Sequence, residues 1–460
     1  MQKLVISEQF MGVKPCEIKL NRFLLLIGEQ ASGKSTIAKL VFFFQTLPTV
    51  IYHNIIKYYP EKPISNDIES TVIAMTGGRF IQTFGTTILT KEGQPKFDIS
   101  FNFNNISNNK KFDIKIYQEP TIQEPTVYTD FDKTLLKNIA KTIKQYIEAK
   151  RIDKEIDEIK ARTQFLNGLN QLFNLQTNEY TYLVAGRNNI TAFPELFERV
   201  VFQEFEKLSE DEVKNQDFIH RQRLGNERLL YEFVQWSRGI RNYFKNNGQT
   251  FEEVALGLEN RKSTGLILNI TKNILKGKYV MSNSGETIKG NDNSFDINLK
   301  DASSGQQEVL RILQGLFLSV GLKNRREFFV IEEPEAHLYP LAQNELINAF
   351  AVFLNTITQS RLIITTHSPY ILACVNILLF AQYVAHEVGV QNGAINQIPR
   401  EYWLNSTMFN AYSLGQSDAY CVNIKDPETG LIDQNYLDTI SEQLGLQYQE
   451  LYNLLTQEAI

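Results

Sequence analysis

Short alternations of apolar and polar residues begin at Leu4 and lead into a continuous apolar run at 23–27. Such a run is typical of a central parallel strand that is buried on both faces. A loop bounded by glycines follows it. Residues 35–44 then contain neither Gly nor Pro, which predicts a helix that stops near Pro48.

Further along the chain, segments with strand-like patterns alternate with segments with helical patterns. Residues 71–118 look rich in strands, and the segments 97–103 and 112–117 alternate around an Asn-rich turn, which predicts an antiparallel hairpin. Residues 265–300 look strand-like with Asn and Gly turns, after which sheet and helix patterns alternate to about residue 385. The rest of the chain combines a loop-rich stretch with a short helical tail, and no internal repeat is visible.

Two blocks have apolar residues at helical spacing among many charges, at 132–173 and at about 194–259. We predict that they form an inserted helical arm or lid, with a return strand and a glycine-containing exit at 180–187 between them. The predicted units are therefore residues 1–125, 126–262 (the arm), 263–385, and 386–460, an extension of unknown role.

Composition narrows the class of protein. With 43% hydrophobic and 22% charged residues, we expect a soluble globular chain and exclude a disordered or low-complexity one. The formal charge of −5 excludes a protein that coats nucleic acid through global positive charge, so any DNA contact needs a local patch of positive charge.

Three dispersed cysteines, Cys16, Cys374 and Cys421, fit a reducing cytoplasm. No secretory signal is visible, and residues 370–385 are predicted to form a buried helix or strand rather than a membrane span.

The first candidate for chemistry is the loop at 28–35, which matches G-x-x-x-x-G-K-[ST] between an apolar strand and a helix start. In such a loop backbone N–H groups and the helix N-terminus face the phosphates. Lys34 is expected to reach the β- and γ-phosphates and Ser35 to ligate Mg²⁺. The alternative, a glycine-rich turn with a chance Lys-Ser pair, rarely follows a buried strand. The residues predicted to bind nucleotide are Gly28, Gln30, Ala31, Ser32, Gly33, Lys34, Ser35 and Thr36.

A second candidate is the apolar segment 328–331, which ends in Glu332 and Glu333. Ligands bind at the carboxyl ends of strands in α/β sheets. We predict that Glu332 orients the Mg²⁺ shell and that Glu333 positions the attacking water. Taken alone, such a pair is more often a solvated turn; the phosphate-binding loop reverses that preference.

Two further elements complete the set. Residues 302–308 precede an apolar helix at 309–320, and Ser303 there could serve simply as a helix N-cap. The apolar segment 362–364 leads to Thr365, Thr366 and His367. A single His at a strand end is usually structural. His367 lies about 35 residues beyond the Glu pair, and the expectation that it bonds the γ-phosphate rests on the family resemblance given next.

Together these motifs resemble ABC-type ATPases, and 332–340 (EEPEAHLYP) is similar to their SMC-like, overcoming-lysogenisation-type branch rather than to transporter cassettes. The resemblance covers residues 1–120 and 265–385. It implies an α/β P-loop ATPase head: a mixed sheet with flanking helices, an antiparallel β subdomain and an inserted helical lid or short coiled-coil arm. It also implies that two heads sandwich ATP and Mg²⁺ as a homodimer, with Lys34, Ser35 and Thr36 acting in cis. Ser303, Gly305 and Gln306 would then act in trans.

In the family roles, Glu333, His367 and Lys34 are catalytic, and Ser35 and Glu332 bind the metal. The family's Q-loop glutamine has only Gln82 as a candidate. Arg187 is ambiguous, since it could reach the nucleotide, the lid or nothing.

The chain also resembles the ATPase component of bacterial anti-phage systems of the Septu and PARIS type, which implies a sensor or scaffold that controls a separately encoded nuclease or Toprim effector. No D-x-D motif of a fused Toprim domain follows residue 385. One alternative is a DNA-repair ATPase that clamps DNA directly. Another is a module that binds ATP without turnover, against which the intact Glu332, Glu333 and His367 argue. Basic residues in the arm could contact DNA, although a solvated helix face paired with nearby acidic residues is the favoured explanation: Lys133, Lys137, Lys141, Lys144, Lys150, Arg151, Arg221, Arg223, Arg228, Arg238 and Arg241. We expect a cytoplasmic protein with no membrane partner. The sequence does not predict whether the dimers assemble into larger oligomers.

Overall fold

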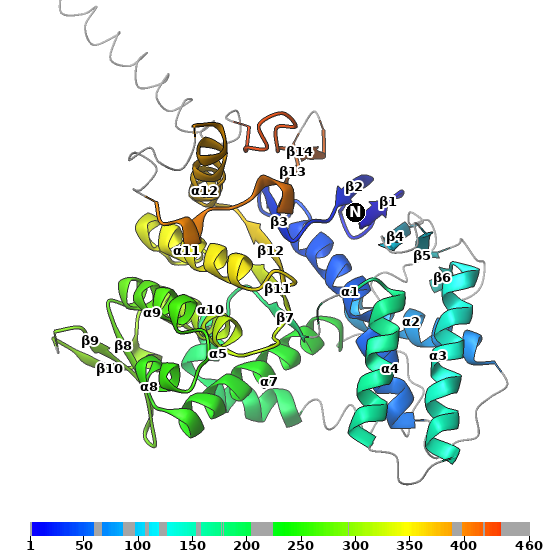
Figure 1. Cartoon of the computed structure of the whole chain (residues 1–460), viewed down its shortest axis with the longest axis horizontal. Coiled ribbons are helices and arrows are strands. Elements are labelled where there is room, and N and C mark those ends of the chain that lie inside the picture. The colour runs from blue at the N-terminus through cyan, green and yellow to red at the C-terminus, as the bar shows by residue number, and fades with distance from the viewer. Residues whose placement is uncertain are drawn as a thin grey trace, which may run out of the picture.

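A six-stranded sheet forms the centre of the molecule, in the order β14-β13-β3-β12-β11-β7 (Figure 1). The computed structural model describes residues 2–58, 67–85, 97–105, 110–118, 127–152, 158–175, 177, 179–203, 224–292, 294–388, 398–416 and 419–433. Neighbouring strands of the central sheet are parallel, except that β14 runs antiparallel to β13 at the edge. The strands are β3 (Phe23–Gly28), β7 (Glu179–Leu183), β11 (Glu327–Glu332), β12 (Arg361–Thr366), β13 (Phe409–Leu414) and β14 (Cys421–Asn423).

Helices cover both faces of this sheet, which confirms the predicted buried parallel strand. Successive side chains of a strand point to opposite faces. Leu24 and Leu26 of β3 accordingly belong to one apolar core, and Phe23 and Leu25 belong to another. The first core includes α1 (Lys34–Tyr58). The second includes α9 (Arg261–Leu275), α10 (Ser304–Gly321), α11 (Pro340–Thr356) and α12 (Pro369–Val388).

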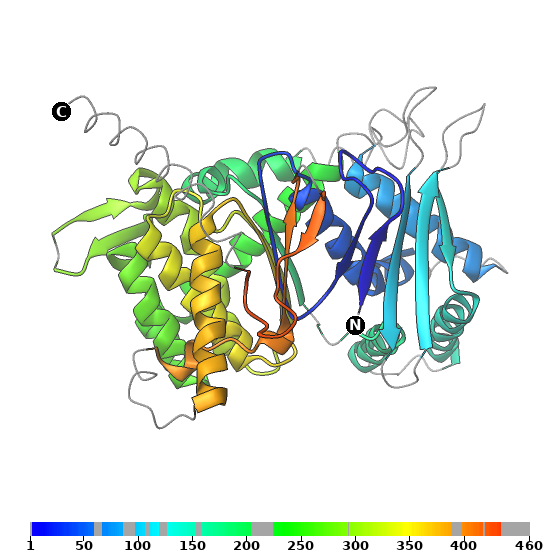
Figure 2. The ribbon, with the colours of Figure 1, turned by 90° about the horizontal axis from the view of Figure 1, so that it is seen from above.

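An antiparallel sheet in the order β2-β1-β4-β5-β6 lies beyond α1, and Figure 2 shows its strands at the end opposite the hairpin formed by β8 and β9. The expected hairpin is confirmed, because β4 and β5 pair antiparallel with Phe101 opposite Ile114. Apolar side chains of α3 and α4 share the core of this sheet and of α1. The elements are β1 (Lys3–Ile6), β2 (Cys16–Lys19), β4 (Asp98–Asn105), β5 (Lys110–Gln118), β6 (Val127–Phe131), α2 (Ile68–Phe84), α3 (Lys133–Ile152) and α4 (Glu158–Leu172).

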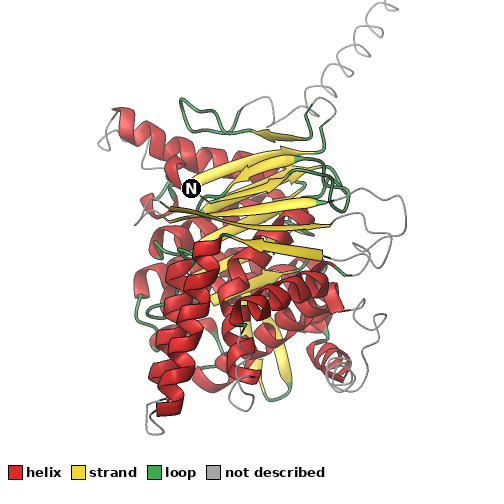
Figure 3. Cartoon of the chain, turned by 90° about the vertical axis from the view of Figure 1, so that its right-hand side faces the viewer, coloured by secondary structure: helices red, strands yellow, loops and turns green. Residues whose placement is uncertain are grey.

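A third, small sheet in the order β10-β9-β8 packs beside α7 and α9. Figure 3 shows the strands of the sheets together with the helices that flank them. Further helices and strands include α5 (Asn188–Ala192), α7 (Leu224–Asn247), α8 (Phe251–Leu256), β8 (Gly277–Ser282), β9 (Gly285–Gly290) and β10 (Asp296–Asn298). The short 3-10 helices include η3 (Leu299–Asp301), η5 (Arg400–Tyr402) and η6 (Ser406–Met408).

Three local predictions are wrong, each because tertiary packing outweighs local preference. Helix α1 continues through Pro48 to Tyr58, since Ile51 and Ile55 stay buried on one face and outweigh the hydrogen bond that proline cannot donate. Residues 71–84, expected to be strand-rich, form α2, which Asp67 caps by accepting from the Ser70 N–H at 2.9 Å. Residues 265–275, also expected to be strand-like, belong to α9, whose isoleucines line one buried face.

The described parts of the helical blocks at 132–173 and 194–259 are largely helical, but they pack on the head. Ile139 of α3 and Phe165 of α4 lie in the core shared with α1, and Phe233 of α7 lies in the other core. Strand β7, between the blocks, is a strand of the central sheet next to β11. The chain beyond residue 385 contributes β13 and β14 to the same sheet, so the described part of the extension completes the head. Three predicted features lie outside the described residues: the Asn-rich turn at 106–109, the basic residues Arg221 and Arg223, and the helical tail.

Helices α1 and α12 are long and apolar enough to cross a membrane by length and composition. The apolar window of α1 is 67% buried, and α1 carries Lys34 of the phosphate-binding loop; the window of α12 is 33% buried. The segment 370–385 is thus a helix, as one of the two expectations had it, with only one face packed into the core.

Candidate active site

The phosphate-binding loop joins β3 to α1, and two of its positions leave no room for a side chain. Gly33 has φ +89°, and a Cβ there would lie 2.6 Å from the Tyr420 hydroxyl and 2.7 Å from Val13 Cγ2. A Cβ at Gly28 would lie 2.3 Å from the carbonyl oxygen of Leu414 on β13. Helix α1 begins at Lys34, so its free N–H groups face the loop, where an anion is favoured.

Lys34 lies folded onto the loop that carries it. Its Nζ donates to the carbonyl oxygens of Gly28 at 2.9 Å and Glu29 at 2.7 Å, and to Ser32 Oγ at 3.2 Å. Its Nζ also lies 3.4 Å from His367 Nδ1. Burial lowers the pKa of Lys34, and the carboxylates of Glu333 and Glu335 oppose that shift.

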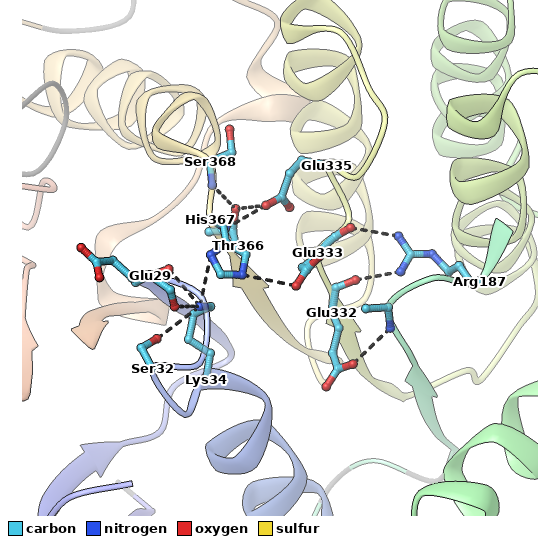
Figure 4. Close-up of polar contacts among 12 residues, drawn as sticks. Glu29, Ser32, Lys34, Arg187, Glu332, Glu333, Glu335, Thr366, His367 and Ser368 are labelled. Atoms are coloured by element: carbon cyan, nitrogen blue, oxygen red, sulfur yellow. Dashed lines mark hydrogen bonds and ion pairs between the residues drawn. The ribbon is translucent and has the colours of Figure 1, made fainter. Parts of the chain in front are cut away.

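His367 and Glu333 continue this contact across the end of the sheet. His367 Nε2 lies 3.3 Å from Glu333 Oε1, so Lys34, His367 and Glu333 form one connected group (Figure 4). Glu333 follows β11 with φ +44°, a left-handed conformation that is costly for a residue other than Gly. Its N–H donates to the Thr365 carbonyl at 2.8 Å, which fixes the turn against β12. Three residues predicted to be catalytic are thereby brought together.

Glu332 ends β11 and is only 6% exposed. The hydroxyl of Tyr182 donates to its Oε1 at 2.6 Å and the N–H of Ala185 donates to its Oε2 at 3.1 Å. Burial, and then the charge of Glu332, raise the pKa of Tyr182 well above its usual value, so this tyrosine stays a donor. These bonds, from β7 and from the segment that follows it, fix the orientation of the Glu332 carboxylate.

Of the other residues predicted to bind nucleotide, Gln30 and Ala31 are exposed and Ser32 is buried. Ser35 and Thr36 are half-buried in the first turn of α1. This places a hydroxyl pair at the helix N-terminus beside the loop.

Ser303 caps helix α10, which confirms its structural role. Its Oγ accepts from the Gln306 N–H at 3.3 Å, and Gln306 Oε1 accepts from the Ser303 N–H at 3.1 Å. Gly305 packs tightly, because a Cβ there would lie 2.6 Å from the His337 carbonyl oxygen. Among the described residues, none of the hydrogen bonds of this segment reaches the phosphate-binding loop. The structure therefore does not join Ser303, Gly305 and Gln306 to the Lys34 group within one chain.

A model of the AAA ATPase domain matches residues 5–372 of the sequence, a range that contains every motif described above. The chain belongs to the AAA ATPase domain family. No curated protein matches the sequence.

Two solved structures are similar to this AAA ATPase chain over most of its length. One is described as "Crystal structure of the SmcHead bound to the C-winged helix domain of ScpA"; it is 11% identical, with 92% of this chain and 96% of that chain covered and a TM-score of 0.40. The other, the SMC head domain from Thermotoga maritima, is 10% identical, with 92% and 98% covered and a TM-score of 0.33. The expected mixed α/β ATPase head is confirmed by the family and by the sheet order itself.

The donor set of this AAA ATPase fits a magnesium ion that arrives with ATP. Among the residues that the structure describes, no group of three or more His, Cys, Asp or Glu side chains could hold a metal alone. Mg²⁺ is usually bound by one or two carboxylates together with substrate phosphates and water. Ser35 and Glu332 therefore remain the predicted protein ligands, and phosphate oxygens would complete the shell.

Two contacts of the site are not predicted by the sequence motifs. Tyr420, beyond the family match, donates its hydroxyl to the Ser32 carbonyl at 2.7 Å. Glu335 accepts from the Thr366 hydroxyl at 2.6 Å and from the His367 N–H at 2.9 Å. Both contacts join segments that are distant in sequence, so only the fold reveals them.

Gln82, the candidate for the Q-loop, lies in the last turn of α2, which packs against β6, α3 and α7. The segment that leaves the central sheet beside β11 is instead 184–187, directly after β7. The sheet edge thus presents Arg187 rather than Gln82 beside Glu332 and Glu333.

Proposed function

We propose that this AAA ATPase hydrolyses ATP in a Mg²⁺-dependent reaction. The observation that carries the proposal is the contact chain from Lys34 through His367 to Glu333 at the carboxyl end of β3, β11 and β12. A phosphate-binding lysine, a histidine and a carboxylate are the groups that position a γ-phosphate and a water.

Each residue has a separate role in this reaction. Lys34 exchanges its bonds to the carbonyls of Gly28 and Glu29 for bonds to phosphate oxygens. Glu333 orients the attacking water and accepts its proton, and His367 contacts the γ-phosphate between them. Mg²⁺ would neutralise the charge that develops on the phosphates.

We further propose that two heads form a homodimer around two ATP molecules. Ser303 and Ser304 at the start of α10 are exposed, as a segment that binds the partner's nucleotide must be. Apolar side chains at the starts of α11 and α12 are also exposed: Tyr339 by 74%, Leu341 by 73% and Tyr370 by 57%. Large exposed apolar side chains support a protein interface.

Steady-state ATP turnover tests the hydrolysis. Lys34→Met removes the phosphate-binding ammonium and should abolish turnover, while Lys141→Met, at an exposed position of α3, serves as the matched control. Chelation of Mg²⁺ should stop the wild-type reaction. A Lys34→Met variant that hydrolyses ATP at the control rate would overturn the proposal.

For the biological role, we propose a cytoplasmic sensor or scaffold in anti-phage defence whose ATP-bound state controls a separately encoded nuclease or Toprim effector. The resemblance of the motifs to such ATPases supports this role. The test is to purify the Glu333→Gln chain from its host with ATP present, with and without phage challenge. A stoichiometric nuclease or Toprim partner would support the role, whereas repair proteins and DNA alone would contradict it.

A second candidate function, direct clamping of DNA, is favoured by one face of α3. Lys133, Lys137, Lys141 and Lys144 are all exposed there, at helical spacing. Among the described residues, the ion pairs of this region involve Lys150 and Arg162 with Glu158, and none involves these four lysines. Neighbouring lysines four residues apart are ~6 Å apart along the axis, which suits successive phosphates. The test is DNA binding measured against salt: a slope reduced in Lys137→Gln/Lys141→Gln supports clamping, and no binding excludes it.

A further inference from the structure

Arg187 is completely buried, with 0% of its surface exposed, just beyond the end of β7. A fully buried arginine is rare unless its charge and donors are paired. All of its hydrogen bonds within the described part of the chain go to main-chain carbonyls, and none goes to the phosphate-binding loop. The guanidinium is therefore built into the head rather than aimed at a ligand.

Two of these bonds hold the turn that carries the catalytic carboxylate. Nη1 donates to the Glu332 carbonyl at 2.7 Å and Nη2 donates to the Glu333 carbonyl at 3.2 Å (Figure 4). Nη1 also donates to the Val184 carbonyl at 3.0 Å, in the segment that follows β7. Glu333 has the left-handed φ of +44°, a conformation that surrounding contacts must maintain. The planar fork thus fixes two successive carbonyls where the backbone is strained.

The same guanidinium also holds the helix that begins at Ser303. Its Nε donates to the Glu308 carbonyl at 3.1 Å and lies 3.2 Å from Glu308 Oε2. Glu308 is itself 0% exposed and lies in the second turn of α10. One rigid side chain therefore bridges α10 and the Glu333 turn.

We propose that Arg187 is a positioning residue for ATP hydrolysis, which ties the location of Glu333 to that of helix α10. The inference rests on the ATPase proposed above. It deepens that proposal, because α10 begins with the residues expected to contact the partner's nucleotide. A displacement of α10 on dimer formation is then transmitted to the catalytic carboxylate of the same head through Arg187.

The test compares Arg187→Lys with Arg311→Lys. Arg311 is also 0% exposed, lies on α10 and binds both oxygens of the buried Glu286 at 2.7 Å, but it has no bond to the Glu333 turn. Lysine preserves the charge in each case, yet a single ammonium cannot reproduce the fork across several carbonyls. The two variants therefore suffer similar structural losses and differ in the link to Glu333.

Measurements are kcat and KM for ATP, the Kd of a fluorescent ATP analogue with Mg²⁺, and thermal unfolding, all on the full chain. We expect Arg187→Lys to lower kcat by about 100-fold, the cost of misplacing a catalytic group by ~1 Å, with an unchanged Kd. Arg311→Lys should retain the wild-type kcat. Equal kcat in the two variants, or a lost Kd in Arg187→Lys, would overturn the inference.

Glu308→Gln provides a second variant if Arg187→Lys does not fold. It keeps the backbone bonds of Arg187 and weakens only the link to α10, so kcat should fall by about 10-fold while KM is unchanged. A Glu308→Gln chain with wild-type kcat contradicts the link. A wild-type chain with no turnover overturns both this inference and the proposed ATPase, whereas an active wild type with an equally active Arg187→Lys overturns the inference alone.

Discussion

Glu335, in the turn after β11, allows a direct test of which hydrogen bonds fix the position of His367 in the site. This side chain is 9% exposed, and its Oε1 accepts from the Thr366 hydroxyl at 2.6 Å and the His367 N–H at 2.9 Å. Its Oε2 is buried without a hydrogen bond among the described residues. Glu335→Ala removes the acceptor and leaves both donors at the end of β12 without their partner.

The expected loss follows from these two bonds. A hydrogen bond to a charged group contributes ~1.5–3 kcal/mol, so the free energy of unfolding should fall by about 3 kcal/mol or somewhat more. The bonds also fix the backbone of His367, whose ring lies between Lys34 and Glu333. We therefore expect kcat to fall by ~100-fold as well. Glu335→Gln keeps one acceptor oxygen and should recover most of both quantities.

Urea unfolding and steady-state ATP turnover measure the two effects, with Glu148→Gln on exposed α3 as the control. The reasoning fails if Glu335→Ala unfolds at the control midpoint with the control kcat. It also fails if Glu335→Gln is more damaged than Glu335→Ala, since the hydrogen-bond acceptor would then be irrelevant.

Three further predictions concern other parts of the head. Tyr420→Phe loses the 2.7 Å bond to the Ser32 carbonyl, so the Kd of a fluorescent ATP analogue should rise by about 5-fold, the equivalent of ~1 kcal/mol; an unchanged Kd contradicts this. Pro48→Ala restores an N–H for the Phe44 carbonyl inside α1 and should stabilise the chain by up to ~3 kcal/mol in urea unfolding, a gain whose absence would show that the helix has adapted fully. Burial raises the pKa of Glu327 to about 7, so the folded state holds a proton that the unfolded state has lost. Stability should then fall as pH rises from about 4.5 to about 7, and Glu327→Gln should flatten that slope in thermal unfolding; a variant with the wild-type slope would refute the assignment.

The local motifs were predictable because their chemistry lies in consecutive residues. The loop at 28–35 needs glycines at fixed spacing, and the structure shows positive φ at Gly33 with no room for a Cβ. The apolar runs before Glu332 and His367 became β11 and β12, which pair in parallel and bring both side chains to one edge. The placement of this catalytic group follows from sequence order and from the geometry of parallel sheets.

Contacts between residues that are distant in sequence could not be predicted from local sequence patterns. Tyr420 meets Ser32 across 388 residues, and Arg187 meets Glu333 across 146. Thr71, Val72 and Ile73 in helix α2 are β-branched and favour strands, but the burial of Val72 and Phe80 stabilises the helix. Strands β13 and β14 carry no motif, so their place in the central sheet emerged only with the fold.

The central claim is that Lys34, His367 and Glu333 form a hydrolytic site, and ATP turnover by Glu333→Gln tests it most directly. We expect this variant to bind the fluorescent ATP analogue with Mg²⁺ as the wild type does and to lose turnover, because glutamine fills the same space but cannot accept the proton of water. Glu148→Gln should retain wild-type turnover. A Glu333→Gln chain that turns over ATP at the rate of Glu148→Gln would contradict the account.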